Sequence, residues 1–367
     1  TWSRTGVLTK TGSNSSLMKR RGDPDAGPQG IIAVDKPLGI SSHGVVARVR
    51  RIAGTRRVGH AGTLDPDASG VLILGLGRAT KLLGFIAGTS KEYLATIRLG
   101  VETNTDDAAG EVTRAQGCSQ ITQITQVAHV AQSTRTADDI PAPLTDLIEH
   151  AMSDFVGDIQ QVPSSVSAIK VNGKRAYSLA RAGEEVKLKS RQVTVDRFSM
   201  VGEPRVEEIQ MGDDPLTVVD IDVVVDCSTG TYVRALARDL GRALGVGGHL
   251  TALLRTRVGP WTLADCVTLD QLEDDAGSPE ALPLIGMGTA ASRVLPSLVI
   301  TNSAASRFLH GAAPQREDVV RGLDDVQDQG VAAVFSGSDT ERLLGLISVD
   351  GGRLKIQAVL ASPASSA

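Results

Sequence analysis

Aromatic residues, cysteines and long apolar runs are all scarce in this chain of 367 residues. Aromatic side chains make up only 3% of it, so the core must be built mainly from Val, Ile, Leu and Ala. No stretch of about 18 uncharged apolar residues occurs, which argues against a transmembrane helix. The three cysteines, Cys118, Cys227 and Cys266, are far apart and odd in number. They fit neither a zinc site nor a disulfide framework, and therefore favour a reducing cytoplasm and no structural metal.

Charge is low overall but unevenly distributed. The net charge is −4, yet residues 1–100 carry +9 and residues 101–367 carry −13. The densest basic stretch has no acidic residue between positions 36 and 64, and contains Arg48, Arg50, Arg51, Arg56 and Arg57. Such an asymmetry is expected of a local surface that binds a polyanion such as RNA. A solvated helix face would produce the same cluster, and the sequence alone leaves both interpretations open.

Composition divides the chain into three parts. Residues 1–28 are polar, lack the apolar segment of a signal peptide, and are expected to be a disordered extension. Residues 29–292 hold the strongest periodic patterns, interrupted by a polar stretch over 113–147 that we expect to be an insertion or a long loop. The composition changes again near position 292, and residues 293–362 predict a compact, β-rich module.

Hydrophobic periodicity by itself predicts an α/β protein. We expect strands at 30–34, 71–76, 91–99, 217–226, 298–301 and 331–335, and a hairpin at 343–361. We expect helices at about 43–53, 143–156, 231–244 and 303–309. Arg234, Arg238 and Arg242 would share one face of the helix at 231–244 because they are spaced by four residues.

The segment from Gly59 to Gly70 is rich in glycine and also contains His, Thr, Asp and Ser, and we expect it to be a loop. Asp65 precedes Pro66, which pushes Asp65 out of the helical conformation. Small neighbours leave room for a ligand to approach the backbone. Asp65 therefore becomes a candidate nucleophile or base, although an ordinary turn residue would have the same surroundings.

Each of the three tyrosines lies beside a basic residue: Tyr93, Tyr177 and Tyr232. Aromatic rings next to cations suit base stacking and phosphate contact. A tyrosine buried in the core with a tethered hydroxyl is the alternative at each position. Pattern alone thus indicates a candidate RNA site and leaves the reaction undetermined.

Five blocks, in one order over about residues 30–290, closely resemble the bacterial tRNA pseudouridine-55 synthases of the TruB family. The blocks are IIAVDKPLGISSHGVV, RVGHAGTLDPDASGVLILGLGRATK, SKEYLATIRLGVETNTDDAAGEV, QVPSSVSAIKVNGKRAYSLARAGEEV and CSTGTYVRALARDLGRALGVGGHLTALLRTRVG. The resemblance implies an α+β pseudouridine synthase fold, with a mixed, largely antiparallel sheet, flanking helices and a small PUA-like C-terminal domain. It also implies that a T-loop uridine of tRNA, position 55, is flipped out and isomerised without a cofactor or metal.

The resemblance assigns roles to four residues of the expected active site. Asp65 matches the catalytic aspartate, which is proposed to attack either the ribose C1′ or the uracil C6. Arg234 matches the basic residue that pairs with this aspartate, an ion pair that would keep the carboxylate charged and oriented. Tyr93 matches the aromatic residue that stacks on the target base, and Leu253 matches an apolar residue that closes the uracil pocket.

Further residues are expected to bind RNA or support the site. His60 matches a histidine that fills the space left by the flipped nucleotide, with an ordinary loop histidine as the alternative. Asp107 matches an acid that contacts the base or its neighbours, and Asp106 beside it is the alternative. Lys36 is expected to support the site or touch RNA. The other expected RNA contacts are Lys170, Arg48, Arg51 and Arg56.

One block departs from the family pattern, because Ser164 and Val166 stand where many members have a proline and an aromatic residue. This departure puts base contacts from that strand in doubt. The expected partner is the T-arm and elbow of tRNA, bound by a cytoplasmic monomer with no membrane and no obligate protein partner. The alternative function is an RNA-folding chaperone that opens the tRNA elbow without chemistry, which would not need Asp65 paired to Arg234. A catalytic subunit of a guide-RNA particle is disfavoured by the small C-terminal module.

Overall fold

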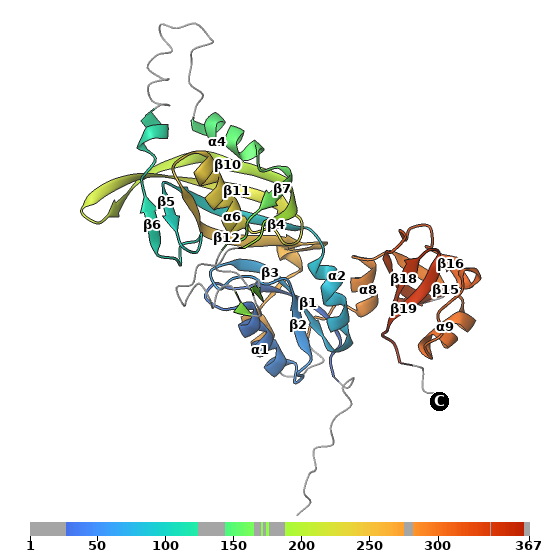
Figure 1. The fold of residues 1–367 in the computed structure, drawn as a ribbon. Coiled ribbons are helices and arrows are strands. Elements are labelled where there is room, and N and C mark those ends of the chain that lie inside the picture. The colour runs from blue at the N-terminus through green and yellow to red at the C-terminus, as the bar shows by residue number, and fades with distance from the viewer. Residues whose placement is uncertain are drawn as a thin grey trace, which may run out of the picture.

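Two β-sheets, each with its own helices, organise the described part of the chain (Figure 1). The computed structural model describes residues 27–123, 144–164, 170–171, 174–175, 188–274, 282–337 and 339–362. The expected N-terminal extension up to residue 26, residues 124–143 of the expected insertion, Val166 and Tyr177 lie outside the described residues.

A ten-stranded sheet forms the larger part, in the order β14-β1-β3-β12-β4-β11-β10-β7, with β2 paired to β3 and β13 to β12. Its strands are β1 (Gly30–Lys36), β2 (Val58–Ala61), β3 (Ser69–Leu76), β4 (Lys91–Leu99), β7 (Gly157–Gln161), β10 (Arg191–Met211), β11 (Asp214–Cys227), β12 (Gly248–Val258), β13 (Trp261–Thr262) and β14 (Val267–Thr268). The described pairings are antiparallel except β1 with β14 and β3 with β12. The predicted mixed, largely antiparallel sheet is therefore confirmed.

The centre of this sheet follows the alternation of the sequence. On β4, Tyr93, Ala95, Ile97 and Leu99 point into the core, while the residues between them are more exposed. Strand β3 is buried along almost its whole length because helices and neighbouring strands cover both of its faces. Two small hairpins lie outside the main sheet: β5 (Val101–Thr103) with β6 (Val112–Ala115), and β8 (Lys170–Val171) with β9 (Lys174–Arg175).

The predicted helices over about 43–53, 143–156 and 231–244 are present beside this sheet, whereas its shorter helical segments were not predicted. Helix α1 (Ser42–Ile52) begins after Ser41, whose side-chain oxygen accepts a hydrogen bond from the Gly44 amide at 3.0 Å. The other helical segments are η1 (Gly77–Leu82), α2 (Leu83–Ala87), α4 (Leu144–Ser153), α6 (Val233–Ala243), η3 (Leu263–Asp265), α7 (Leu269–Asp274) and α8 (Met287–Ser292). The expected continuous loop over 59–70 is wrong at its start, because residues 58–61 form β2, an antiparallel neighbour of β3. A strand of four residues is too short for alternating apolar and polar side chains to reveal it, and the hydrogen-bonded pairing with β3 defines it.

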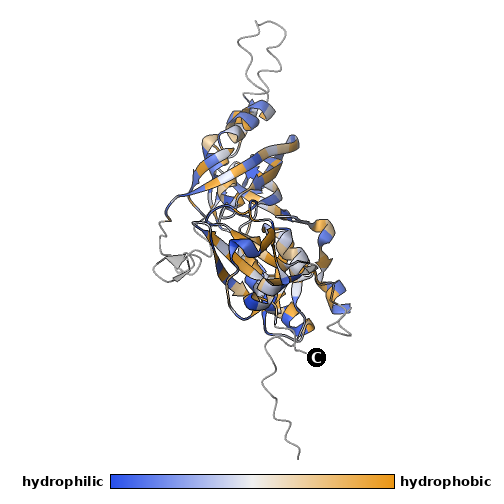
Figure 2. Cartoon of the chain, turned by 90° about the vertical axis from the view of Figure 1, so that its right-hand side faces the viewer, coloured by the Kyte–Doolittle hydropathy of each residue, from blue (hydrophilic) through white to orange (hydrophobic). Residues whose placement is uncertain are grey.

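A second sheet, in the order β16-β15-β17-β18-β19, forms the small C-terminal part. Its elements are β15 (Ser297–Ile300), α9 (Asn302–Leu309), η5 (Arg316–Asp318), β16 (Val319–Arg321), β17 (Val331–Ser336), β18 (Asp339–Asp350) and β19 (Arg353–Val359). Helix α8 packs against both β1 and β18, and one apolar cluster runs through both parts. Hydrophobic and hydrophilic residues are interspersed along the described chain (Figure 2). Among the described residues, no helix is both long and apolar enough to cross a membrane.

Candidate active site

The turn that carries Asp65 joins β2 to β3 and is fixed to the start of α1. The Ser42 hydroxyl donates to the Leu64 carbonyl at 2.9 Å and accepts from the Leu64 amide at 2.8 Å. The Gly39 amide donates to the Pro66 carbonyl at 2.8 Å. Backbone contacts on both sides of Asp65 therefore hold its main chain in place, while its side chain keeps 44% of its surface exposed.

Lys36 supports this turn from beneath rather than facing solvent. It is fully buried, and its ammonium donates to the carbonyls of Pro37, Ile40 and Pro66 at 2.9, 2.7 and 3.3 Å. Burial lowers the pKa of Lys36 to about 8, and the carboxylates of Asp65 and Asp67 oppose that shift. The structure thus gives Lys36 the supporting position, one of the two expected alternatives.

Arg255 is a residue that sequence reasoning missed. It lies on β12 with only 1% of its surface exposed. Its guanidinium donates to the carbonyls of Val71 at 2.8 Å, Gly62 at 3.2 Å and Thr63 at 3.4 Å. It therefore holds both ends of the segment between β2 and β3. The available signal was an arginine directly after the apolar run over residues 252–254 of this strand, since a buried arginine must be fully hydrogen-bonded.

Asp65 and Arg234 meet as predicted. The Asp65 carboxylate lies 2.9 Å from the Arg234 guanidinium, and only 6% of the Arg234 side chain is exposed. Arg234 also contacts the Asp107 carboxylate at 3.3 Å and donates to the Thr105 carbonyl at 2.8 Å. Asp107, rather than Asp106, is the acid that reaches Arg234. One buried cation thus links two carboxylates that are distant in sequence.

Helix α6 presents Arg234 because its opposite side is anchored in the core by Val233, Leu236 and Leu240. Its N-terminus is fixed by Gln161, whose side chain donates to the Tyr232 carbonyl at 3.1 Å and accepts from the Tyr232 amide at 2.8 Å. The Tyr232 ring contacts Arg191, whose guanidinium lies 4.7 Å from the ring centre. This cation is not the basic residue that neighbours Tyr232 in the sequence.

An apolar platform lies beside the Asp65 turn. Tyr93 on β4 is 8% exposed and belongs to the same apolar cluster as Leu64, Ala68 and the partly buried Leu253. Tyr93 pairs in register with Arg255 on the neighbouring strand. Burial raises the pKa of the Tyr93 hydroxyl, and the positive charge of Arg255 opposes part of that rise. The predicted ring and the predicted pocket-closing leucine therefore belong to one apolar cluster with Leu64 and Ala68 of the Asp65 turn.

His60 lies on β2, and its ring makes an edge-on contact with His43 of α1, with ring centres 5.3 Å apart. Burial, followed by the charge of His43, lowers the pKa of His60. Its Nδ1 atom is buried without a hydrogen-bond partner.

The expected phosphate contacts differ in their surroundings. Arg48 and Arg56 are exposed. Arg51 is exposed too, but forms an ion pair with Glu273 at 3.0 Å. Lys170 begins the short strand β8, and its side chain is outside the described part of the structure. No group of three or more His, Cys, Asp or Glu side chains suited to a metal occurs among the residues that the structure describes.

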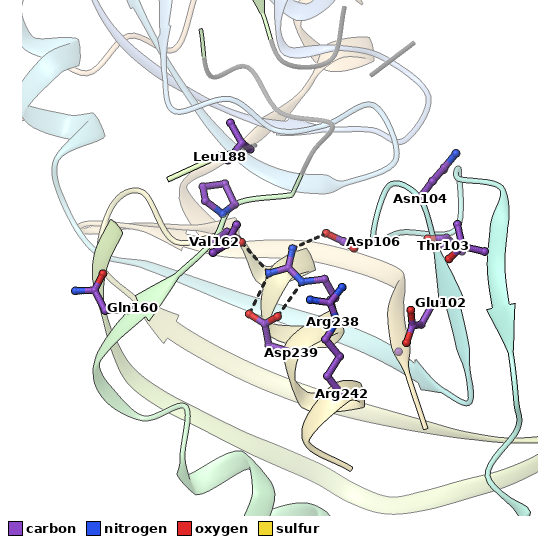
Figure 3. A pocket seen from close by; sticks show the side chains of 13 residues that line it. Glu102, Thr103, Asn104, Asp106, Gln160, Val162, Leu188, Arg238, Asp239 and Arg242 are labelled. Atoms are coloured by element: carbon purple, nitrogen blue, oxygen red, sulfur yellow. Dashed lines mark hydrogen bonds and ion pairs between the residues drawn. The ribbon is translucent and has the colours of Figure 1, made fainter. Parts of the chain in front are cut away.

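A polar pocket of about 450 Å³ opens next to Asp106 and the second turn of α6 (Figure 3). Arg238 lies at its centre, and its guanidinium contacts Asp106, Asp239 and the Val162 carbonyl. The residues that line the pocket are Glu102, Thr103, Asn104, Asp106, Thr113, Gln160, Val162, Pro163, Leu188, Arg238, Asp239, Arg242 and Gly248.

Comparison with solved structures supports the fold. The chain resembles the archaeal box H/ACA sRNP Nop10–Cbf5 complex with a TM-score of 0.61 and 24% identity, over 93% of this chain and 91% of the other. A Cbf5–Nop10–Gar1 complex gives a TM-score of 0.60 at 24% identity, over 91% of this chain and 85% of the other. At this identity the likeness shows the fold alone.

Sequence comparison goes further. The family model "TruB family pseudouridylate synthase (N terminal domain)" matches residues 50–142 and 130–233, and "tRNA pseudouridylate synthase B C-terminal domain" matches residues 234–282. A tRNA pseudouridine synthase B of Streptomyces coelicolor is 45% identical over 90% of this chain and 97% of its own length. Those of Paenarthrobacter aurescens and Mycobacterium ulcerans are 49% and 42% identical, over 77% and 94% of this chain and 79% and 98% of theirs.

These relatives are named for isomerisation and not for RNA folding, so the chaperone alternative is not favoured. The family match extends over the Asp65 turn, the 103–110 turn and α6, the three segments whose side chains meet at the buried arginine. The chain belongs to the TruB family of pseudouridylate synthases.

Proposed function

We propose that this enzyme converts the T-loop uridine at position 55 of tRNA into pseudouridine, with Asp65 as the nucleophile. The observation that carries this proposal is the 2.9 Å ion pair between a half-exposed Asp65 and a buried Arg234. An accessible carboxylate held by a buried cation is oriented toward the open side while remaining available for attack.

The arrangement around Arg234 explains how Asp65 is oriented. Arg234 cannot swing toward solvent, because Asp107 and the Thr105 carbonyl hold its other guanidinium nitrogen. Its charge is shared between two carboxylates, so Asp65 is positioned without being locked into a fully compensated pair. Such shared pairing suits a nucleophile that must leave its partner during the reaction.

The reaction needs one bond to move and one proton to be exchanged. Asp65 attacks either the ribose C1′ or the uracil C6, and the C1′–N1 bond breaks. The uracil turns and its C5 atom bonds to C1′. The bond to Asp65 breaks and releases the carboxylate, and the C5 proton leaves as N1 takes up a proton. No redox step occurs, so we expect the enzyme to work without a cofactor.

The apolar platform supplies a place for the flipped base. Tyr93 and Leu253 belong to the apolar cluster that includes Leu64 of the Asp65 turn, and we expect the pyrimidine ring to stack there. His60, a neutral ring at the edge of this site, would occupy the space that the base leaves. The exposed Arg48 and Arg56 would contact phosphates of the T-arm. We expect a monomer in the cytoplasm that needs no protein partner.

Tritium release tests the proposal. A tRNA transcript carrying tritium at uridine C5 loses that label to water only when C5 becomes the glycosidic carbon. We expect release by the wild type, none from a transcript with cytidine at position 55, and none by Asp65→Asn, which should still bind tRNA. Asp67→Asn is the matched control, since Asp67 is an exposed neighbour in the same turn. A wild type that binds tRNA but releases no tritium would refute the proposal in favour of a chaperone.

A further inference from the structure

A second ion pair lies one helical turn beyond the Asp65–Arg234 pair. Arg238 follows Arg234 by four residues on α6, so the two guanidinium groups share one face of the helix. Arg238 contacts the Asp106 carboxylate at 3.1 Å, and both side chains are nearly buried, with 11% and 12% of their surfaces exposed. Arginines on two consecutive turns of α6 therefore bind one short segment of the chain.

That segment is the turn between β5 and β6. Arg234 holds the residues on either side of Asp106, through the Thr105 carbonyl and the Asp107 carboxylate. Arg238 holds Asp106 itself. Three consecutive residues are thus bound alternately by two arginines, and any movement of Asp106 must move its neighbours.

The backbone conformation at Asp106 depends on these contacts. Asp106 has a φ of +60°, a conformation that is uncommon for residues with a side chain, although Asp and Asn adopt it more often than most. Its carbonyl accepts a hydrogen bond from the Leu250 amide at 3.1 Å, which links the turn to β12. A conformation of this kind persists only where its surroundings over-determine it. The Arg238 ion pair and the Leu250 hydrogen bond provide that determination.

Arg238 is itself fixed by other groups. Its Nε donates to the neighbouring Asp239 at 2.8 Å, and its Nη2 donates to the Val162 carbonyl at 2.7 Å (Figure 3). Each of these contacts is a hydrogen bond, and a nearly buried guanidinium needs such bonds to replace those that it loses to water. The Arg238 side chain is therefore held in one orientation and differs from a mobile surface cation.

We propose that Asp106 and Arg238 are positioning residues that set the 105–107 turn so that Asp107 and the Thr105 carbonyl hold Arg234 in its catalytic orientation. This inference rests on the proposed function of the Asp65–Arg234 pair. The ion pair acts through Arg234 and touches no reacting atom. It should therefore govern the rate of isomerisation rather than the affinity for tRNA.

Single-turnover kinetics with excess enzyme separate these two effects. Asp106→Asn keeps the size of the side chain and its tolerance of positive φ, but removes the charge. Asp106→Gly tolerates positive φ even better and also lacks the carboxylate. We expect both variants to lose about tenfold or more in rate, with tRNA affinity within about twofold of the wild type, because small displacements of catalytic groups are costly.

Variants of Arg238 complete the test. Arg238→Gln should lose a similar factor, and Arg238→Lys, which keeps the charge, should retain most of the rate. The double variant Asp106→Asn, Arg238→Gln should be little slower than the slower single variant, since both changes break the same interaction. The control is Asp222→Asn, which breaks the ion pair with Arg205 on the β10–β11 hairpin and should leave the rate unchanged.

The outcomes distinguish this inference from the proposed function. Wild-type rates in both Asp106 variants would overturn the positioning role, and so would multiplicative losses in the double variant. Equal losses in rate and tRNA affinity would instead assign Arg238 to RNA binding in the neighbouring pocket. If the wild type formed no pseudouridine at all, the proposed function itself would fail.

Discussion

The buried Arg255 provides a quantitative test of how the active site is built. Replacement by methionine keeps a long, flexible side chain but removes the charge and every donor. The carbonyls of Val71 and Gly62, now bonded at 2.8 and 3.2 Å, would lose their partner. The hydrogen bond to the Thr63 carbonyl, at 3.4 Å, is long and weak, so it adds little to this estimate.

The expected loss of stability follows from these contacts. A buried acceptor left without a partner costs about 1–3 kcal/mol, so the two carbonyls together cost about 2–6 kcal/mol. Removing the guanidinium also removes the penalty of burying its charge, which offsets part of this loss. We therefore expect Arg255→Met to lower the free energy of unfolding by about 2–4 kcal/mol, within the range of single core substitutions.

Activity should fall more than stability alone requires. Arg255 fixes the backbone at both ends of the segment that carries Asp65, so its loss should let the carboxylate move away from Arg234. We expect a single-turnover rate at least about tenfold lower at a temperature where the variant is fully folded. Urea unfolding followed by circular dichroism gives the first quantity, and pseudouridine formation with excess enzyme gives the second.

A neighbouring arginine supplies the control. Arg257, on the same strand, donates to the Asp226 carboxylate at 2.6 Å, and its other hydrogen bonds go to Ser90 and Gly259 rather than to the Asp65 turn. Arg257→Met should cost some stability and leave the rate unchanged. If Arg255→Met retained wild-type rate and stability, or if both variants slowed the reaction equally, the assignment of Arg255 as the support of the Asp65 turn would be refuted.

Three further predictions concern pH, packing and RNA binding. Burial lowers the pKa of Lys36 from 10.5 to about 8. The unfolded chain therefore binds more protons than the folded one between these values, and Lys36 makes stability rise with pH across that window. Lys36→Met should remove that rise. The measurement is the free energy of unfolding from urea titrations at about pH 8 and about pH 10, and an equal change with pH in the wild type and the variant would contradict the prediction. Gly70→Ala should prevent folding, because the new Cβ would lie 2.2 Å from the Arg255 carbonyl oxygen and the backbone has a φ of +101°. A variant with the thermal melting curve of the wild type would contradict this prediction. Arg48→Gln and Arg56→Gln should each weaken tRNA binding and reduce the slope of log affinity against log salt by about 1, whereas unchanged slopes in filter binding would exclude phosphate contacts.

Local chemistry in the sequence was enough for the elements with a clear apolar period, but not for strands such as β10 and β12. The alternation over 91–99 predicted β4, because each second side chain must be apolar to enter the core. The apolar spacing over about 43–53 predicted α1, and the structure shows that the Ser41 hydroxyl caps it by accepting from an amide of the first turn. The resemblance placed Asp65 and Arg234 in one site, and the structure brings them to 2.9 Å. These features depend on neighbours in sequence or on a family pattern, and both can be read without coordinates.

Tertiary structure decided the features that depend on distant partners. Arg255 and Val71 are 184 residues apart, and only the parallel pairing of β12 with β3 reveals why this arginine is buried. The choice between Asp106 and Asp107 could not be made from two adjacent acids. It follows from the turn geometry, which points one carboxylate to Arg234 and the other to Arg238. Sequence determined which groups are present, whereas the register of the sheet and the conformation of one turn determined which of them meet.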